Sequence, residues 1–364
     1  LVVIQLSGGN DGINTVIPYS TPQYAQSRPT LGIPKDQVLA LDDNIALHPN
    51  LKAVKALWDQ KAVAVVQGVG YPNPNRSHFQ SMQIWQTASP DNSLSTGWLG
   101  RYDEASLQGQ RLGALNFGDQ LPRTLWTEHT VVPSIGSLSN YQFMTDPKAP
   151  DDKQAQIDAV NKIFSNPVNR DGPDFFRTSA IDAFQTASDL KNAVAGAKSN
   201  AQYPTTGIGN QLKLVGQLIS SGLGTRIYYV SLGSFDTHSG EKNQHDRLMQ
   251  QLNDAVDAFT KDLQAQGTFD KTAIMTFSEF GRRVQENGSQ GTDHGTAEPM
   301  FVIGGGVKGG LYGSYPSMSD LDQGDLKFTT DFRSVYGGIV SDWLGGDATV
   351  ATGGTFPKVP IFGS

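Results

Sequence analysis

The sequence contains no cysteine, and this absence excludes several kinds of chemistry. Without thiols the chain forms no disulfide bond, uses no thiolate nucleophile and offers no cysteine ligand to zinc or to an iron–sulfur cluster. A chain without thiols also suits oxidising surroundings, although the absence alone assigns no compartment. Any metal site must therefore be built from histidine and carboxylate side chains.

Charged residues and long apolar runs are scarce as well. Only 17% of the residues are charged, the net charge is −7 and the pI is about 5.3. Nucleic-acid binding normally needs a basic stripe, so we expect no nucleic-acid partner. No apolar run reaches the roughly 18 residues that a membrane span needs, so we expect no membrane span.

The 364 residues include 40 glycines and 19 prolines, so loops should be plentiful around a sizeable core. The chain starts at Leu1, without Met and already inside an apolar run. We therefore expect that a segment such as an export signal was removed upstream.

Short apolar runs alternate with helical patterns along the chain. Because their apolarity is continuous, these runs predict strands covered on both faces, as in a parallel sheet. The predicted strands are 1–6, 62–66, 225–232, 271–277 and 300–303.

Helical spacing is clearest between two of these strands. The apolar residues there recur every three or four positions: Leu248, Leu252, Val256, Phe259 and Leu263. Residues 225–277 therefore predict a strand–helix–strand crossover. A helix around residues 51–57 precedes the strand at 62–66 in the same way.

Predicted strands lie near both ends of the chain, which favours one domain with a central insertion. Three helical stretches, 154–165, 174–198 and 208–220, follow a turn-rich segment at 90–150. We interpret 90–221 as an insertion and helical region within a single domain at 1–345. We expect residues 346–364 to form a C-terminal tail packed on that domain.

Polar residues flank the predicted strands, and in open α/β sheets ligands bind beyond the carboxyl ends of strands. Three of the six histidines occur at these places. Carboxylates and neutral imidazoles are ligands of zinc, manganese and iron, so the pattern predicts a divalent metal site. The flanking residues are Asp11, Arg76, Ser77, His78, Asp236, His238, Glu279, Arg282, Asp293 and His294.

Each of these fragments also has a structural explanation. Aspartates beside glycines form turns, Ser77 could be only a helix N-cap, and Glu279 could form a surface ion pair. His245 lies on the apolar side of its predicted helix and is interpreted as structural. His48 and His129 have no carboxylate context that favours a metal site.

Together these stretches resemble the domain-of-unknown-function 1501 (DUF1501) family, sulfatase-like members of the alkaline phosphatase superfamily. The stretches that carry the resemblance include GGNDGINTVIPY, VGYPNPNRSHF, GSFDTHSG and TFSEFGRRVQENGSQGTDHGTAEPMFVIGGG. The resemblance implies a three-layer α/β/α sandwich with a central, mostly parallel sheet. It also implies an exported protein, periplasmic or extracellular, commonly with a twin-arginine signal.

The resemblance further implies a site of one or two divalent ions at the carboxyl edge of the sheet, with a nucleophile at a helix N-terminus. Ser77 resembles that nucleophile. Asp11 comes later than the family's usual first metal Asp, and Phe280 replaces the His that usually follows the position of Glu279. No Ser-x-Pro-x-Arg replaces the missing cysteine, so formylglycine-type sulfatase chemistry is not expected.

The sequence therefore predicts an exported metal-dependent hydrolase of phosphoric or sulfuric esters, acting on a small-molecule or polymer-borne anionic ester. Zinc is the expected ion, with manganese, calcium or iron as alternatives. The predicted metal ligands are Asp11, Asp236, His238, Glu279, Asp293 and His294.

The predicted catalytic residues are Ser77, His78 and Arg76. Ser77 or a water would attack, His78 would be a ligand or general acid, and Arg76 would bind a non-bridging oxygen. Two alternatives remain open. One is a catalytically degenerate extracellular metal- or glycan-binding protein. The other is a metal-free serine hydrolase, for which the G-x-S-x-G motif is missing.

Overall fold

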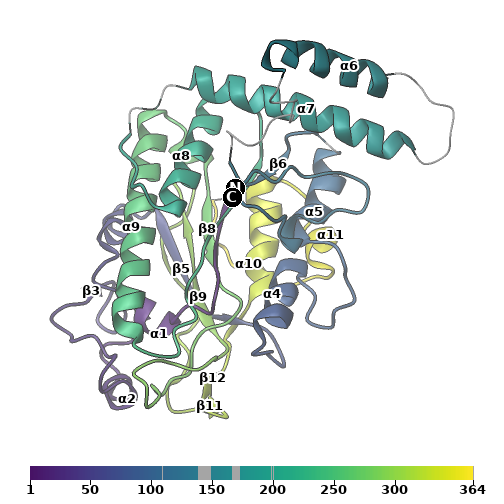
Figure 1. The fold of residues 1–364 in the computed structure, drawn as a ribbon. Helices are drawn as coiled ribbons and strands as arrows, with labels where there is room; N and C mark the ends of the chain where they lie inside the picture. The colour runs from purple at the N-terminus through teal and green to yellow at the C-terminus, as the bar shows by residue number, and fades with distance from the viewer. Residues whose placement is uncertain (109, 138–148, 166–172, 198, 200, 364) are drawn as a thin grey trace.

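The computed structural model describes residues 1–108, 110–137, 149–165, 173–197, 199 and 201–363. Within this part of the chain, an eight-stranded sheet has the order β10-β5-β9-β8-β1-β7-β6, with β13 beside β5 (Figure 1). The strands of the sheet are β1 (Val2–Leu6), β5 (Val63–Gly70), β6 (Ala114–Asn116), β7 (Ile227–Leu232), β8 (Ile274–Phe277), β9 (Glu298–Ile303), β10 (Gly310–Tyr312) and β13 (Thr330–Asp331).

All five predicted strands are confirmed, and most of the pairing is parallel. β1 pairs in parallel with both β7 and β8, which establishes the predicted crossover. β9 is an exception, because it runs antiparallel to β5 and β8. The segment that precedes β9 therefore lies at the same sheet edge as the carboxyl ends of β1, β7 and β8.

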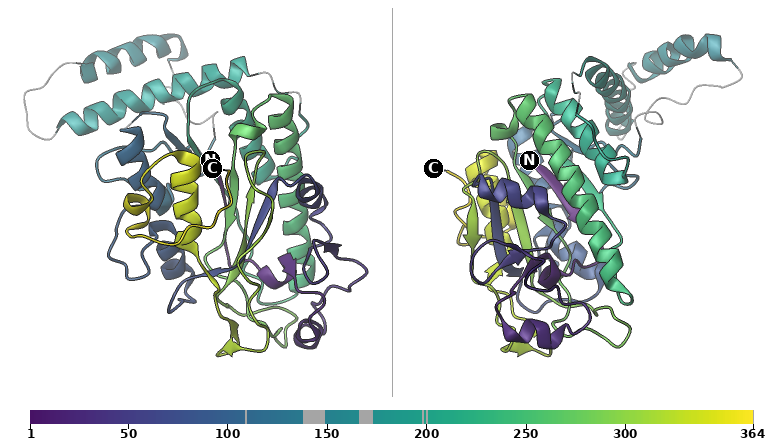
Figure 2. Two further views of the ribbon diagram at one scale, coloured as in Figure 1. Left: turned by 180° about the vertical axis from the view of Figure 1, so that it is seen from behind. Right: turned by 90° about the vertical axis from the view of Figure 1, so that its left-hand side faces the viewer.

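Helices cover both faces of the sheet (Figures 1 and 2), which confirms the predicted three-layer α/β/α sandwich. Val2 and Ile4 of β1 belong to the core on one face, while Val3 belongs to the core on the other. The helices on the first face are α3 (Lys52–Asp59), α8 (Gly207–Ser220) and α9 (Glu241–Ala265). Those on the second are α4 (His78–Thr87), α5 (Trp98–Tyr102), α10 (Phe332–Gly338) and α11 (Ala348–Thr352).

The predicted helices at 154–165, 174–198 and 208–220 are confirmed as α6 (Lys153–Ser165), α7 (Pro173–Gly196) and α8, although residue 198 lies outside the described residues. The helices α6 and α7 lie above the sandwich in the view of Figure 1. No helix among the described residues is both long and apolar enough to cross a bilayer.

Smaller elements complete the fold. They are α1 (Gly12–Thr15), β2 (Val16–Ile17), α2 (Pro22–Ser27), β3 (Leu39–Ala40), β4 (Ala46–Leu47), β11 (Leu321–Asp322) and β12 (Asp325–Leu326). The turn-rich region supplies β6, whose Ala114 pairs with Ile227 at the sheet edge. Near the C-terminus, Ile361 is buried and accepts a hydrogen bond from the Lys308 N–H at 2.8 Å.

Candidate metal centre

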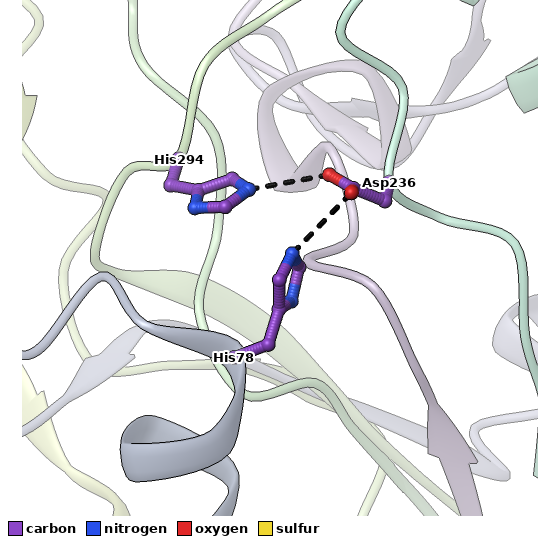
Figure 3. Close-up of side chains that lie close together, drawn as sticks. All are labelled: His78, Asp236 and His294. Carbon is purple, nitrogen blue, oxygen red and sulfur yellow. Dashed lines mark hydrogen bonds and ion pairs between the residues drawn. The ribbon is translucent and has the colours of Figure 1, made fainter.

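Three side chains from distant segments meet at the carboxyl edge of the sheet (Figure 3). His78 is the first residue of α4, Asp236 follows β7 and His294 precedes β9. One ligand atom from each lies within 4.8 Å of those from the other two. The antiparallel direction of β9 brings His294 to this edge, although it comes before its strand in the sequence.

The distances within the group suit coordination of one ion. His294 Nε2 lies 3.2 Å from Asp236 Oδ1, and His78 Nε2 lies 3.4 Å from Asp236 Oδ2. His238 extends the group, with its Nε2 3.0 Å from Asp236 Oδ1 and 2.9 Å from His294 Nε2. Ligand atoms around a tetrahedral zinc with bonds of about 2.0–2.1 Å are about 3.3 Å apart, so the spacing fits.

The Nδ1 atom of each of the three imidazole rings faces an oxygen. His294 Nδ1 is 2.8 Å from the Arg76 carbonyl oxygen, and His78 Nδ1 is 2.8 Å from Glu279 Oε1. His238 Nδ1 is 3.3 Å from a carboxylate oxygen of Asp293. A carbonyl or carboxylate oxygen only accepts, so each of these oxygens can hold an Nδ1–H, and a ring in that tautomer presents an unprotonated Nε2 to the group.

The Nε2 atoms of all three rings face one carboxylate, at 3.0–3.4 Å from an oxygen of Asp236. His238 Nε2 and His294 Nε2 lie 2.9 Å apart, a distance that one shared proton or a cation bound to both nitrogens would satisfy. His78 Nε2 is buried and has no hydrogen-bond partner within the described part of the chain. Imidazoles whose Nδ1–H is held by an oxygen acceptor are typical of metal sites, so these residues fit a divalent ion.

The acid–base state of Asp236 and His294 agrees with this fit, whereas the hydrogen bond to Glu279 raises the pKa of His78. Burial would raise the pKa of Asp236, but hydrogen bonds from Arg282 and His294 dominate and lower its pKa to about 2. Burial also lowers the pKa of His294, which keeps this ring neutral near pH 7. An ionised carboxylate and a neutral imidazole are the forms that bind a metal.

Glu279 and Asp293, which were predicted as metal ligands, lie one layer outside the group. Glu279 Oε1 receives the Gly8 N–H at 2.9 Å as well as His78 Nδ1, and Glu279 Oε2 accepts from Ser278 Oγ at 3.1 Å. Asp293 faces His238 Nδ1. In the observed arrangement these carboxylates orient the imidazoles.

Arg282 joins three loops of the site, a role that its sequence context did not reveal. Its side chain is fully buried, and its Nη2 donates to Asp236 Oδ1 and to the Phe235 carbonyl oxygen, each at 2.9 Å. Its Nε donates to the Gly9 carbonyl oxygen at 2.7 Å, and its Nη1 to that of Thr292 at 2.9 Å. The arginine pair after β8 was the available signal, but the partners depend on the tertiary structure.

Two glycines allow these loops to approach closely. Gly8 has a φ of +119°, and a Cβ there would lie 2.5 Å from the Asp236 backbone nitrogen. A Cβ on Gly291 would collide with the backbone of His238. Larger residues would therefore separate the loop after β1, or the loop before His294, from the loop that carries Asp236 and His238.

The structure does not bring Asp11 to this group. Asp11 is fully buried and forms two hydrogen bonds with Arg28, at 2.6 Å and 3.0 Å. Burial opposes ionisation, but the Arg28 guanidinium holds the pKa of Asp11 well below its usual range. Burial, followed by the neighbouring Asp11 charge, raises the pKa of Glu241.

The predicted catalytic residues lie around His78. The Arg76 guanidinium forms an ion pair with the buried Asp325, and its carbonyl oxygen faces His294 Nδ1. Ser77 is the exposed N-cap residue of α4, but its side chain makes no capping hydrogen bond. Its hydroxyl group therefore has no structural role at the helix end.

Residues 1–325 match the family described as "Protein of unknown function (DUF1501)". The chain belongs to the DUF1501 family. This confirms the resemblance found in the sequence, and a comparison with curated proteins finds no match.

Solved structures similar to this DUF1501 protein are distant. The C-terminal periplasmic domain of EcEptC from Escherichia coli, in complex with Zn, is 12% identical, with 83% of this chain and 72% of that chain covered and a TM-score of 0.33. A phosphonate monoester hydrolase of Agrobacterium radiobacter is 11% identical, covers 98% and 77%, and has a TM-score of 0.36. A 2-O GAG sulfatase is 12% identical, covers 85% and 65%, and has a TM-score of 0.29.

Proposed function

We propose that this DUF1501 protein is a metal-dependent hydrolase of phosphoric or sulfuric esters. His78, Asp236 and His294 would hold one divalent ion, most readily zinc, with His238 as a fourth ligand. One observation carries the proposal: imidazole Nε2 atoms converge on Asp236 while each Nδ1 faces an oxygen. Hydrogen bonding to Nδ1 leaves Nε2 free to bind a cation.

A divalent ion, when bound, would supply a Lewis acid and neutralise negative charge on the ester. Glu279 and Asp293 would keep His78 and His238 oriented through their Nδ1 protons. Arg282 would fix Asp236 from the opposite side. These groups are held by buried or paired partners, so little reorganisation would be needed when a substrate binds.

The nucleophile in this proposal is Ser77 Oγ or a water molecule. Ser77 directly precedes His78 and its side chain is not used to cap α4. Attack on phosphorus or sulfur forms one new bond to oxygen and breaks the bond to the alcohol oxygen, and the proton that the nucleophile loses ends on the departing alcohol. With Ser77 as nucleophile, a water then releases the covalent ester and restores the serine.

Metal analysis combined with activity assays tests the proposal. Purified protein should contain about one divalent transition-metal ion per chain and should hydrolyse members of a panel of phosphate and sulfate esters. The variants Asp236→Asn and His238→Ala should lose both the bound metal and the hydrolytic activity. His129→Ala, at an exposed histidine outside the group, should retain them. Ser77→Ala should keep the metal, and loss of turnover in this variant would identify the serine as nucleophile.

The outcomes separate the alternatives. Metal-replete, folded protein that is inert towards the whole panel would support a degenerate binding protein instead. Activity that survives complete chelation would support a metal-free serine hydrolase. An exported location, which the family resemblance implies, is part of the proposal and requires fractionation of cells that express the complete gene.

A further inference from the structure

An open groove of about 740 Å³ adjoins the candidate metal centre. His78 belongs both to its lining and to the metal centre, and Glu279, which faces His78 Nδ1, also lines the groove, so the two spaces adjoin. The groove is also lined by residues of α4, by the carboxyl ends of β1 and β7, and by the segment 116–126. A volume of this size is typical of a small-molecule site and exceeds the needs of a phosphate or sulfate group alone.

Part of the groove lining is a network of neutral side chains. Gln86 Nε2 donates to Gln5 Oε1 at 2.8 Å, and the Tyr229 hydroxyl donates to the same oxygen. Gln5 Nε2 donates to Ser7 Oγ at 2.5 Å, while Gln86 Oε1 accepts the Arg123 N–H at 3.1 Å. These bonds fix the amide side chains in place before any ligand binds, which lowers the entropic cost of binding.

Two aromatic side chains of the same lining are exposed. Phe79 is 89% exposed and follows His78 directly, and Trp126 is 41% exposed. The Trp126 ring is held by a hydrogen bond from its Nε1 to the Leu121 carbonyl oxygen at 3.1 Å, and the Arg123 guanidinium lies 4.7 Å from its centre. Exposed aromatic surface of this kind gains free energy when a ligand covers it.

The groove carries little net charge. The Glu279 carboxylate faces His78 Nδ1 and the metal centre, and the remaining charged groups of the lining, Asp119 and Arg123, have opposite signs. A polynucleotide would need a row of cations, and a lipid tail would need a continuous apolar wall. Aromatic rings beside fixed amides match a ligand with apolar C–H faces and many hydroxyl groups, which is the chemistry of a sugar.

We propose that this groove binds the sugar part of a carbohydrate phosphate or sulfate ester, whose anionic group reaches the metal centre. The assignment of the ester rests on the proposed function, whereas sugar binding by the groove can be measured without any turnover.

The binding experiment uses metal-replete protein on an array of neutral and sulfated oligosaccharides, followed by calorimetric titration of the strongest binder. Phe79→Ala and Trp126→Ala should each weaken that binding at least 10-fold. Phe328→Ala, which removes another exposed aromatic ring outside this groove, should change it less than 2-fold. Equal metal content in all four proteins controls for damage to His78.

A parallel kinetic experiment compares para-nitrophenyl phosphate and para-nitrophenyl sulfate with glucose 6-phosphate and glucose 6-sulfate. In Trp126→Ala, KM for the sugar ester should rise at least 10-fold while kcat/KM for the aryl ester changes less than 2-fold. Oligosaccharide binding that depends on Phe79 and Trp126, without turnover of any ester, would support the groove assignment and contradict the proposed hydrolase.

Two results would contradict the proposal that the groove binds a sugar. Turnover of aryl esters with no oligosaccharide binding and no effect of Trp126→Ala on sugar esters would overturn it and leave the hydrolase standing. An equal loss of oligosaccharide binding in Phe328→Ala and Phe79→Ala would also overturn it, because the effect would then not be specific to this groove.

Discussion

Two groups of carboxylates near the same sheet edge differ in how their negative charge is balanced. The buried pair of Asp11 and Glu241 has Arg28 as its own cation, and Arg28 donates to both oxygens of Asp11. In the solvent-open group around Asp236, the Nε2 atoms of the imidazoles converge on the carboxylate. Arg282 donates to Asp236 Oδ1, but its other bonds go to backbone oxygens.

This difference explains why similar aspartates after neighbouring strands have different prospects as metal ligands. At Asp11 the fold itself supplies the compensating charge, and both side chains of the ion pair are fully buried. At Asp236, three imidazole Nε2 atoms face the carboxylate from the solvent side, so a cation from solution that binds them would stabilise the group. The hydrogen-bond donors and acceptors around a carboxylate therefore say more about its prospects as a metal ligand than its proximity to a strand end does.

The strongest test of the comparison removes the internal cation. We expect Arg28→Met to lower the free energy of unfolding by about 3–5 kcal/mol, because Asp11 would be left buried without a partner. Urea denaturation of metal-free protein measures this loss. A decrease below about 1 kcal/mol would show that Asp11 is compensated by something other than Arg28.

The second test weakens the outer layer of the solvent-open group. Glu279→Gln should reduce metal affinity about 10- to 100-fold, because a neutral amide holds the His78 Nδ1–H less firmly than a carboxylate does. Competition with a chromophoric chelator measures the affinity. Glu104→Gln is a matched control, since Glu104 accepts backbone N–H bonds near residue 128, and it should leave the affinity unchanged. Equal affinities in the two variants would contradict the proposed role of Glu279.

A third test uses a buried carboxyl group, Asp103, that forms no ion pair with any residue in the described part of the chain. Burial raises the pKa of Asp103 to about 6, and its Oδ1 has no hydrogen-bond partner among the described residues. Because the pKa of Asp103 is higher in the folded than in the unfolded state, protonation of Asp103 favours folding. This contribution to the free energy of unfolding is complete below the unfolded pKa of about 4 and is lost as the pH rises through about 6. Asp103→Asn should therefore stabilise the protein by about 1–2 kcal/mol at pH 8 and have a smaller effect at pH 4.5.

Denaturation of the Asp103→Asn variant and the wild type at both pH values checks this prediction. A variant whose free energy of unfolding differs from that of the wild type by the same amount at pH 4.5 and pH 8 would show that Asp103 does not titrate differently on folding.

The smallest expected effect concerns an exposed ion pair. Lys55 Nζ lies 2.6 Å from Asp59 Oδ1 within α3, with the Asp59 side chain more than half exposed. Lys55→Ala should change the free energy of unfolding by less than about 0.5 kcal/mol, because water solvates both charges. If Lys55→Ala lowered the free energy of unfolding as much as Arg28→Met does, buried and exposed ion pairs would not differ in their contribution to stability.

Much of the fold followed from local patterns. Continuous apolar runs identified the five principal strands, three- and four-residue spacing identified α9, and helix-like stretches identified α6 to α8. Strand direction could not be read in this way, because a fully buried strand has the same composition in either direction. The antiparallel pairing of β9 with β5 and β8 appeared only in the structure.

The sequence by itself identified Asp236, His238 and His294 as polar residues at strand ends, because chemical type and local position are properties of the chain. Only the tertiary structure showed that Glu279 holds His78 and that Asp11 pairs with Arg28. Those contacts join segments 201 and 17 residues apart. Whether a carboxylate faces a guanidinium or a group of imidazoles depends on how such segments pack, so packing decides which carboxylate is a candidate metal ligand.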